Sequence, residues 1–168
     1  ASTTASLAMA DALAVCLLER KSFKEKDFAF FHPGGALGRR LLLTVEDIMR
    51  GGQANAIVGE NKKVSQVLLA ITRARAGSAI IVDRRGKLRG IFTDGDLRRH
   101  LESDKHLLNR QIREVMTKNP TVVKKDMLAA EAMRILQAKK IDEVPVVDKN
   151  MRPQGLLDVQ DLLKAGLV

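Results

Sequence analysis

Several residue types are scarce in this 168-residue sequence, and each scarcity excludes a class of protein. Cys16 is the single cysteine, so no disulfide can form within the chain, and a reducing cytoplasmic compartment is expected. The three histidines, His32, His100 and His106, stand too far apart for zinc-ligand spacing, so no metal is expected. Trp and Tyr are absent, which argues against single-stranded nucleic acid, because such sites stack bases on aromatic rings.

A long uninterrupted apolar run is also lacking. The longest, from Ser6 to Leu18, is interrupted by Asp11 and falls short of the about 20 apolar residues that span a bilayer. It has no basic leader and no cleavage site, so it is not a signal peptide. We therefore expect no membrane contact. The chain begins without Met inside a predicted helix, so we expect a piece of a larger protein.

The charge and apolar content are those of an ordinary globular protein. Hydrophobic residues make up 45% of the chain and charged residues 29%, enough for one domain or two small ones packed together. Lys and Arg number 29 against 20 Asp and Glu, a net charge of +9. We still expect no nucleic-acid partner, because no aromatic or helix-turn-helix signal accompanies the positive charge.

The first part of the chain, residues 1–43, predicts a helix and a loop. A helix is expected over Ala5–Glu19, with Ser2, Thr3 and Thr4 as candidate N-caps. Its apolar residues point in several directions, which is typical of a buried helix, so it needs a partner from another subunit or another domain. We therefore expect a homo-oligomer, a dimer or a tetramer. A loop around Pro33, Gly34 and Gly35 follows.

The remainder of the chain contains an internal repeat, with boundaries at 44–110 and 111–168. Three pairs of segments match in order: Val45–Met49 with Ile112–Met116, Ala79–Asp83 with Val144–Asp148, and Gly90–Leu97 with Gly155–Leu162. Within each repeat an amphipathic helix precedes a β-branched strand, a polar turn, a second strand and a closing helix. The pattern predicts an α/β fold in which a βαββα unit is used twice.

These segments resemble a tandem pair of CBS motifs. The resemblance rests on the Asp-Ile-Met and Glu-Val-Met openings, the Val-Pro-Val-Val-Asp strand and the Gly-hydrophobic-hydrophobic-Thr-x-x-Asp closing, and it covers about Thr44 to Val168. It implies two βαββα repeats packed about a pseudo-twofold axis with the strands inside, preceded here by the N-terminal helix and loop. It also implies a regulatory module with nucleotide sites in the cleft between the repeats.

The whole chain resembles the arabinose-5-phosphate isomerases, a family with a sugar-isomerase (SIS) domain followed by a CBS pair. The resemblance lies in these segments: Ser2-Thr-Thr, Ala10-Asp-Ala-Leu-Ala14, Phe31-His-Pro-Gly-Gly-Ala-Leu-Gly-Arg39, Thr93-Asp-Gly-Asp-Leu-Arg-Arg99 and Asp161-Leu-Leu-Lys-Ala-Gly166. It implies that residues 1–43 end the SIS domain. The family interconverts arabinose 5-phosphate and ribulose 5-phosphate, the first step toward the lipopolysaccharide sugar Kdo.

His32 is the candidate catalytic residue. Aldose–ketose isomerisation moves a proton between carbons, which a histidine does well near neutral pH. A structural histidine beside a turn is the simpler alternative, but the family resemblance places its catalytic histidine in this His-Pro-Gly-Gly motif. No Ser/Gly-rich phosphate loop occurs in residues 1–43, so this chain alone is predicted to be inactive and His32 to act only in the full-length enzyme.

Thr93 and Asp96 are the candidate effector site. In CBS pairs, the resemblance implies, the Asp accepts hydrogen bonds from ribose hydroxyls and the Thr hydroxyl faces a phosphate. Thr-x-x-Asp is also a helix-capping box, which leaves both roles open. In the second repeat Asp161 remains but Asp158 replaces the Thr, and two carboxylates repel a phosphate. We therefore expect the second site to be weak or empty and Asp158 to act as a cap.

Charge and pathway define the expected effector. Residues 44–110 carry 13 basic and 8 acidic residues, against 10 and 8 in residues 111–168, and Arg98 and Arg99 follow Asp96. Family analogy favours an adenine nucleotide as effector, whereas feedback logic favours the cytidine-linked Kdo product. No cofactor is expected to be required. A ligand-free dimerisation module of the same enzyme is the alternative.

Overall fold

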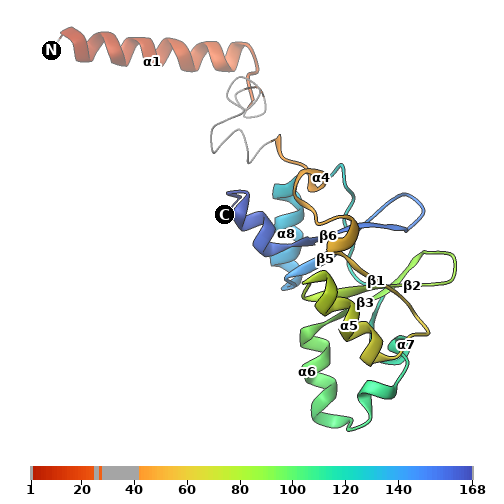
Figure 1. Cartoon of the computed structure of the whole chain (residues 1–168). Coiled ribbons are helices and arrows are strands. Elements are labelled where there is room, and N and C mark those ends of the chain that lie inside the picture. Colours follow the sequence, from red (N-terminus) through yellow and green to blue (C-terminus); the bar gives the residue numbers. More distant parts are fainter. Residues whose placement is uncertain (1, 25–26, 28–41, 168) are drawn as a thin grey trace. The chain divides into compact units, whose positions relative to one another are not determined.

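The computed structural model describes residues 2–24, 27 and 42–167, and the chain divides into two compact units, Ala1–Leu42 and Leu43–Val168 (Figure 1). The first unit contains α1 (Ser2–Arg20). The elements of the second unit are α4 (Val45–Ile48), η1 (Gly52–Ala54), β1 (Ala56–Gly59), α5 (Val64–Ala74), β2 (Ser78–Val82), β3 (Leu88–Thr93), α6 (Asp94–Ser103), η2 (Leu107–Asn109), α7 (Ile112–Val115), β4 (Thr117–Lys118), α8 (Ala129–Lys139), β5 (Glu143–Val147), β6 (Pro153–Asp158) and α9 (Val159–Lys164).

Helix α1 is longer than the sequence predicts. It begins at Ser2, so the predicted caps Ser2, Thr3 and Thr4 lie inside it, and Ser6 Oγ donates to the Ser2 carbonyl. None of its residues is buried within its own unit. Its most apolar stretch of 18 residues has a mean hydropathy of 1.3, which among the described helices meets the length and composition of a membrane span. The length argument against such a span therefore fails, because Ser, Thr and Ala extend the helix beyond the apolar run.

The second unit confirms the predicted mixed α/β repeat. In the first repeat β1 pairs parallel with β2, and β2 pairs antiparallel with β3. In the second repeat β5 pairs antiparallel with β6. Val123, at the position that corresponds to β1, makes only an isolated parallel bridge with Val146. The first strand of the second repeat is thus shortened to a single bridge in the described chain.

Each repeat has its own apolar core, and each core takes residues from the other repeat's opening segment. The core of the first repeat packs the apolar face of α5 against β2 and β3, and it includes Ile112 and Val115 from α7. The core of the second repeat packs α8 against β5 and β6, and it includes Val45 from α4. The two opening helices are therefore exchanged between the repeats.

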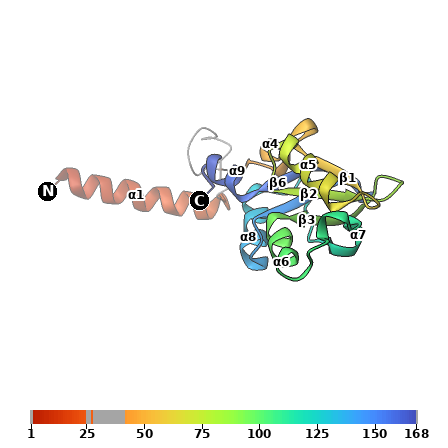
Figure 2. The ribbon, with the colours of Figure 1, turned by 60° about the horizontal axis from the view of Figure 1, so that its bottom comes forward.

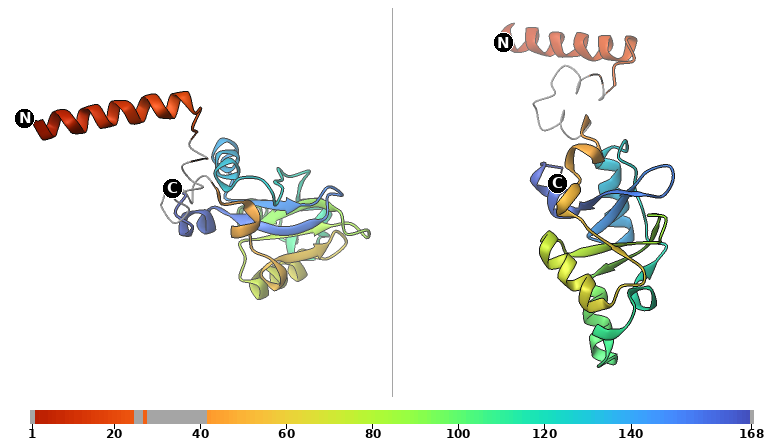
Figure 3. Two further views of the ribbon diagram at one scale, coloured as in Figure 1. Left: turned by 90° about the horizontal axis from the view of Figure 1, so that it is seen from above. Right: turned by 45° about the vertical axis from the view of Figure 1, so that its right-hand side comes forward.

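A third apolar cluster joins the two sets of strands. It consists of Ile80, Leu88, Ile91, Val147 and Leu156. Figure 2 shows β2 and β3 beside β6, and in Figure 3 (left) the strands of both repeats lie between α8 on one side and α5 and α6 on the other. The strands therefore lie inside and the helices outside.

Two glycines allow the exchanged segments to reach the strands of the other repeat. A Cβ on Gly155 would lie 2.6 Å from the Arg50 carbonyl oxygen and 2.8 Å from Met49 Sδ. A Cβ on Gly90 would lie 2.7 Å from the Thr117 carbonyl oxygen and 2.6 Å from Met116 Sδ. These distances are shorter than a side chain tolerates, so the backbone needs glycine at both places.

The contact at Gly155 generates a stability prediction. Gly155→Ala should lower the free energy of unfolding by about 1–3 kcal/mol, because the new methyl group must displace the Arg50 backbone, which is hydrogen-bonded to Leu156. Chemical denaturation of both proteins measures the difference.

Gly51→Ala is the matched control. Gly51 has φ −122°, and a Cβ on this residue would have no neighbouring atom within 4 Å, so the same substitution meets no obstacle there. Equal effects of the two substitutions would show that the close approach at Gly155 does not limit stability.

Candidate functional site

A cleft of about 1030 Å³ lies between the two repeats. Its walls come from four places: the end of β3 with the start of α6, the segment Thr117–Thr121 after the second methionine, the segment Lys140–Glu143 before and in β5, and the start of α9. The cleft is therefore built from both repeats and is large enough for a small ligand of about nucleotide size.

Thr93 and Asp96 line this cleft and form the capping box of α6. The Thr93 hydroxyl accepts a hydrogen bond from the Asp96 backbone N–H at 3.1 Å. In return, Asp96 Oδ2 accepts from the Thr93 backbone N–H and from the Thr93 hydroxyl, both at 3.0 Å. The capping role that the sequence left open is thus present, and it holds the Asp96 carboxylate in a fixed position at the cleft wall.

The second oxygen of Asp96 has replaceable partners. Asp96 Oδ1 accepts from Arg99 Nη2 at 2.6 Å and, over a longer distance of 3.3 Å, from the Thr117 hydroxyl. The Arg99 side chain is 71% exposed. Because the Asp96 carboxylate is buried whereas the Arg99 guanidinium is largely exposed, Arg99 can return to water once another donor takes its place at this oxygen.

The corresponding carboxylates of the second repeat are held differently. Asp158 caps α9, because its Oδ1 accepts from the Gln160 backbone N–H at 2.7 Å. Arg50 Nε donates to Asp161 Oδ2 at 2.6 Å, and Arg50 Nη2 donates to Asp158 Oδ2 at 3.0 Å and to Asp161 Oδ1 at 3.2 Å. Asp161 raises the pKa of Arg50 above its ordinary value, so the guanidinium stays charged between the two carboxylates.

Buried polar groups lie where the two repeats meet. Glu143 lines the cleft, and its Oε1 would lie 2.6 Å from a Cβ on Gly77. Glu143 Oε2 and Ser78 Oγ are both buried, and the Ser78 hydroxyl lies near enough to the Glu143 carboxylate to oppose the rise in its pKa. Burial raises the pKa of Glu143, with a further contribution from the nearby Asp158 carboxylate. The carboxyl therefore keeps its proton to higher pH than an exposed glutamate does.

The structure brings some of the predicted site residues together and separates others. Thr93 and Asp96 share one cleft with Arg98 and Arg99. Asp161 is not among the residues that line it, although Asp158 is. The candidate catalytic residue His32 lies outside the described residues.

Sequence reasoning missed three residues of this region: Arg50, Thr117 and Glu143. A signal for two of them was present in the repeat, since Arg50 follows Met49 as Thr117 follows Met116. Nothing in the sequence marks Glu143, which occupies the position of Ser78 in the first repeat.

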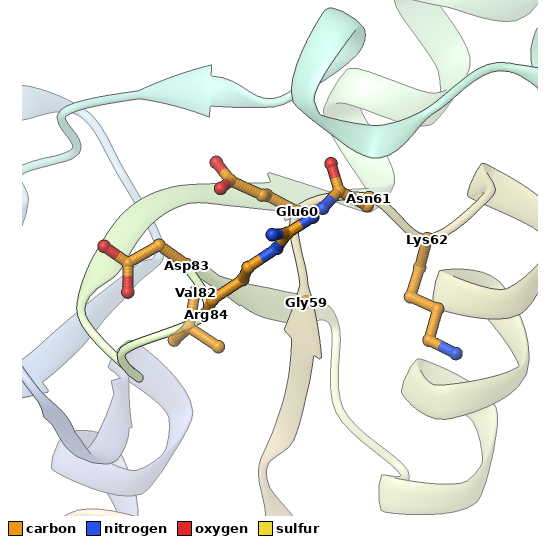
Figure 4. A pocket seen from close by; sticks show the side chains of 7 residues that line it. All are labelled: Gly59, Glu60, Asn61, Lys62, Val82, Asp83 and Arg84. Carbon is orange, nitrogen blue, oxygen red and sulfur yellow. The ribbon is translucent and has the colours of Figure 1, made fainter.

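A smaller pocket of about 260 Å³ lies where β1 and β2 end (Figure 4). The side chains of Glu60 and Asn61 follow β1, and those of Asp83 and Arg84 follow β2. The predicted effector residues Thr93 and Asp96 do not line this pocket and lie instead in the larger cleft. Among the described residues, no group of three His, Cys, Asp or Glu side chains could hold a metal ion.

Comparison with known sequences agrees with the repeat. The family model for the CBS domain matches residues 45–103 and 112–168. Arabinose 5-phosphate isomerase KdsD of Pseudomonas aeruginosa is 47% identical over 167 residues, which are 99% of this chain and 51% of that protein. KdsD of Escherichia coli K12 is 44% identical with the same coverage. The chain matches the C-terminal region of these relatives and spans about half their length.

Comparison with solved structures agrees with the fold. The CBS domain pair of protein MJ0100, in complex with 5′-methylthioadenosine and S-adenosyl-L-methionine, has a TM-score of 0.66 at 25% identity, covering 73% of this chain and 94% of that one. CBSX2 in complex with AMP has a TM-score of 0.63 at 25% identity, covering 74% of this chain and 96% of that one.

The raised pKa of Glu143 generates a prediction about pH. Above the raised pKa the folded protein must hold a buried carboxylate, whereas below the ordinary pKa the group is protonated in both states. Glu143 therefore lowers stability as the pH rises through this window. Glu143→Gln removes this dependence, so its stability relative to the natural protein should increase from about pH 4 to about pH 8, as measured by chemical denaturation.

Glu131→Gln, at an exposed glutamate on α8, serves as the control and should show a smaller change with pH. A difference between Glu143→Gln and the natural protein that is the same at both pH values would contradict the assignment.

Proposed function

Because this chain belongs to the CBS-domain family, we propose that it is a regulatory module that binds an adenine nucleotide in the cleft containing Thr93 and Asp96. The observation that carries the proposal is the way in which Asp96 is buried and hydrogen-bonded at the cleft wall. This residue is 6% exposed and fixed by the capping box, yet one of its carboxylate oxygens is held only by an exposed arginine and a 3.3 Å contact. The CBS pairs with the same fold bind adenosine-containing ligands, one of them AMP, which supports this ligand class.

The binding mode follows from the groups around the cleft. The ribose hydroxyls donate to Asp96 Oδ1 and replace Arg99 there, so the buried carboxylate keeps its hydrogen bonds while the exposed Arg99 side chain returns to water. The displaced Arg99 and the neighbouring Arg98 remain at the cleft wall, where their guanidinium groups pair with a phosphate. The positive end of α6, a ten-residue helix, favours the same negative charge.

The parent protein is proposed to be a cytoplasmic arabinose 5-phosphate isomerase, and this chain its regulatory part. The support is the 42–47% identity with proteins of that name over nearly the whole chain. Nucleotide binding then acts through differential affinity: a ligand that binds one arrangement of the module more tightly shifts the isomerase toward the matching state. On this proposal the product feeds Kdo and lipopolysaccharide synthesis.

Calorimetry with AMP as the probe tests the site. Asp96→Ala should weaken binding tenfold or more, because a hydrogen bond to a charged acceptor contributes about 1.5–3 kcal/mol and about 1.4 kcal/mol corresponds to tenfold in affinity.

Asp47→Ala provides the matched control. At α4, Asp47 Oδ2 accepts from the Thr44 backbone N–H and hydroxyl, as Asp96 Oδ2 does from Thr93 at α6, but neither Thr44 nor Asp47 lines the cleft. Asp47→Ala therefore loses a helix cap and should keep the affinity for AMP. If the Asp96→Ala variant binds AMP as tightly as the natural chain does, the assignment of the site to Asp96 is wrong.

Titration with CMP tests the cytidine alternative, since tighter binding of CMP than of AMP would reject the adenine preference.

A second expectation concerns activity. This chain should not convert arabinose 5-phosphate above background, because its first 43 residues contain no Ser/Gly-rich phosphate-binding loop. In the full-length enzyme His32→Ala should reduce kcat by about 10²–10⁴-fold, the usual contribution of a general acid–base group. A coupled assay of ribulose 5-phosphate formation measures both. Turnover by this chain alone would contradict the proposal that this chain is regulatory and that catalysis needs the full-length enzyme.

The rival function is association of subunits without a ligand. The specific observation that favours it is the exposure, within their own unit, of the apolar side chains of α1, among them Leu7, Met9 and Leu13. We propose that another protein surface covers this helix in a homo-oligomer. The two functions differ in the calorimetric test, since a purely structural module binds neither AMP nor CMP.

A further inference from the structure

We propose that Arg50 is the permanent internal occupant of the second repeat's ligand position, so that the module has one nucleotide site per chain instead of two. The inference goes beyond the proposed function, on which it rests for the choice of probe. It assigns a specificity-determining role to a residue of the first repeat that acts on the carboxylates of the second.

The repeat places Arg50 and Thr117 at equivalent positions. Each follows the methionine that ends an opening segment, and each has its carbonyl oxygen against the strand glycine of the other repeat, Gly155 for Arg50 and Gly90 for Thr117. The side chain of each then meets the aspartate at the start of that repeat's closing helix. The backbone is thus arranged alike around the two aspartates, and the difference lies in the side chain at this one position, arginine or threonine.

At the first position the supplied group is small. The Thr117 hydroxyl approaches Asp96 at 3.3 Å and leaves the cleft open beside it. At the second position a guanidinium makes three hydrogen bonds to Asp158 and Asp161. A planar group with several donors thus binds both carboxylates at the position where the proposed mode puts ribose hydroxyls.

Arg50 cannot leave its carboxylates as Arg99 can. Its side chain is 23% exposed, against 71% for Arg99. Its backbone is fixed by two hydrogen bonds with Leu156, from Arg50 N–H at 2.8 Å and to the Arg50 carbonyl at 3.0 Å. Removal of the guanidinium would also leave two carboxylates together in a partly buried place, which is unfavourable. A neutral ribose therefore cannot compete with Arg50.

The negative charge of Asp158 is a second reason why a nucleotide does not bind in the second repeat. Thr93 offers a hydroxyl at the corresponding position of the first repeat, whereas Asp158 offers a negative charge that Arg50 neutralises. If Arg50 moved away, the two carboxylates would repel the phosphate of a nucleotide. Arg50 and Asp158 thus act as a pair, and a second site requires that both be replaced.

The test converts the second repeat into the pattern of the first. The double variant Arg50→Thr, Asp158→Thr is compared with the natural chain by calorimetry, with AMP as the probe. We expect one AMP per chain for the natural protein and two for the double variant. Addition of Asp96→Ala to the double variant should leave one, bound in the second repeat, whereas Asp96→Ala alone should bind at least tenfold more weakly. Thermal unfolding checks that each variant is folded.

The outcomes separate this inference from the proposed function. Two AMP molecules on the natural chain would overturn the inference and keep the function, and this count stands even if the variants do not fold. A folded double variant that gains no site would also overturn it. If the natural chain binds no AMP, the proposed function fails, while binding of one AMP by the double variant with Asp96→Ala would still support the role of Arg50.

Discussion

The second unit depends on two places where backbone packs directly against a glycine Cα. At Gly155 and Gly90 the chain that follows each opening helix enters the strand region of the other repeat, closer than any side chain would permit. This contact fixes the position of α4 against the core of the second repeat and of α7 against the core of the first. The exchanged helices complete both cores, so the interface between the repeats is part of the folding of each.

The same contact also determines the chemistry at each end of the cleft. The residue whose carbonyl oxygen makes the close approach, Arg50 or Thr117, also has its side chain on an aspartate of the other repeat. Two architecturally equivalent positions therefore acquire different properties through one side chain. A duplicated fold can in this way keep its symmetry of structure while it loses its symmetry of function.

Much of the fold could be predicted from the sequence, because it is local. The apolar spacing of Val64, Val67 and Ile71 predicts α5, and Thr93 and Asp96 mark the start of α6. The ion pair of Arg50 could not be predicted in this way, since it joins residues 108 and 111 positions apart. The burial of Glu143 depends on its approach to Gly77 across the repeats, which no local pattern encodes. The apolar side chains of α1 are exposed within their own unit, and no local pattern encodes which surface covers them.

The exchange of the opening helices has a consequence for how such a protein can arise. A polypeptide with only one of the two repeats would lack Val45 or Ile112 and Val115 in its core, and would regain them only from a second molecule. The single repeat is thus suited to a domain-swapped homodimer, and fusion of two copies in tandem turns that dimer into one chain. Once fused, the copies no longer have to be identical, and a substitution such as arginine for threonine can be accepted in one half alone.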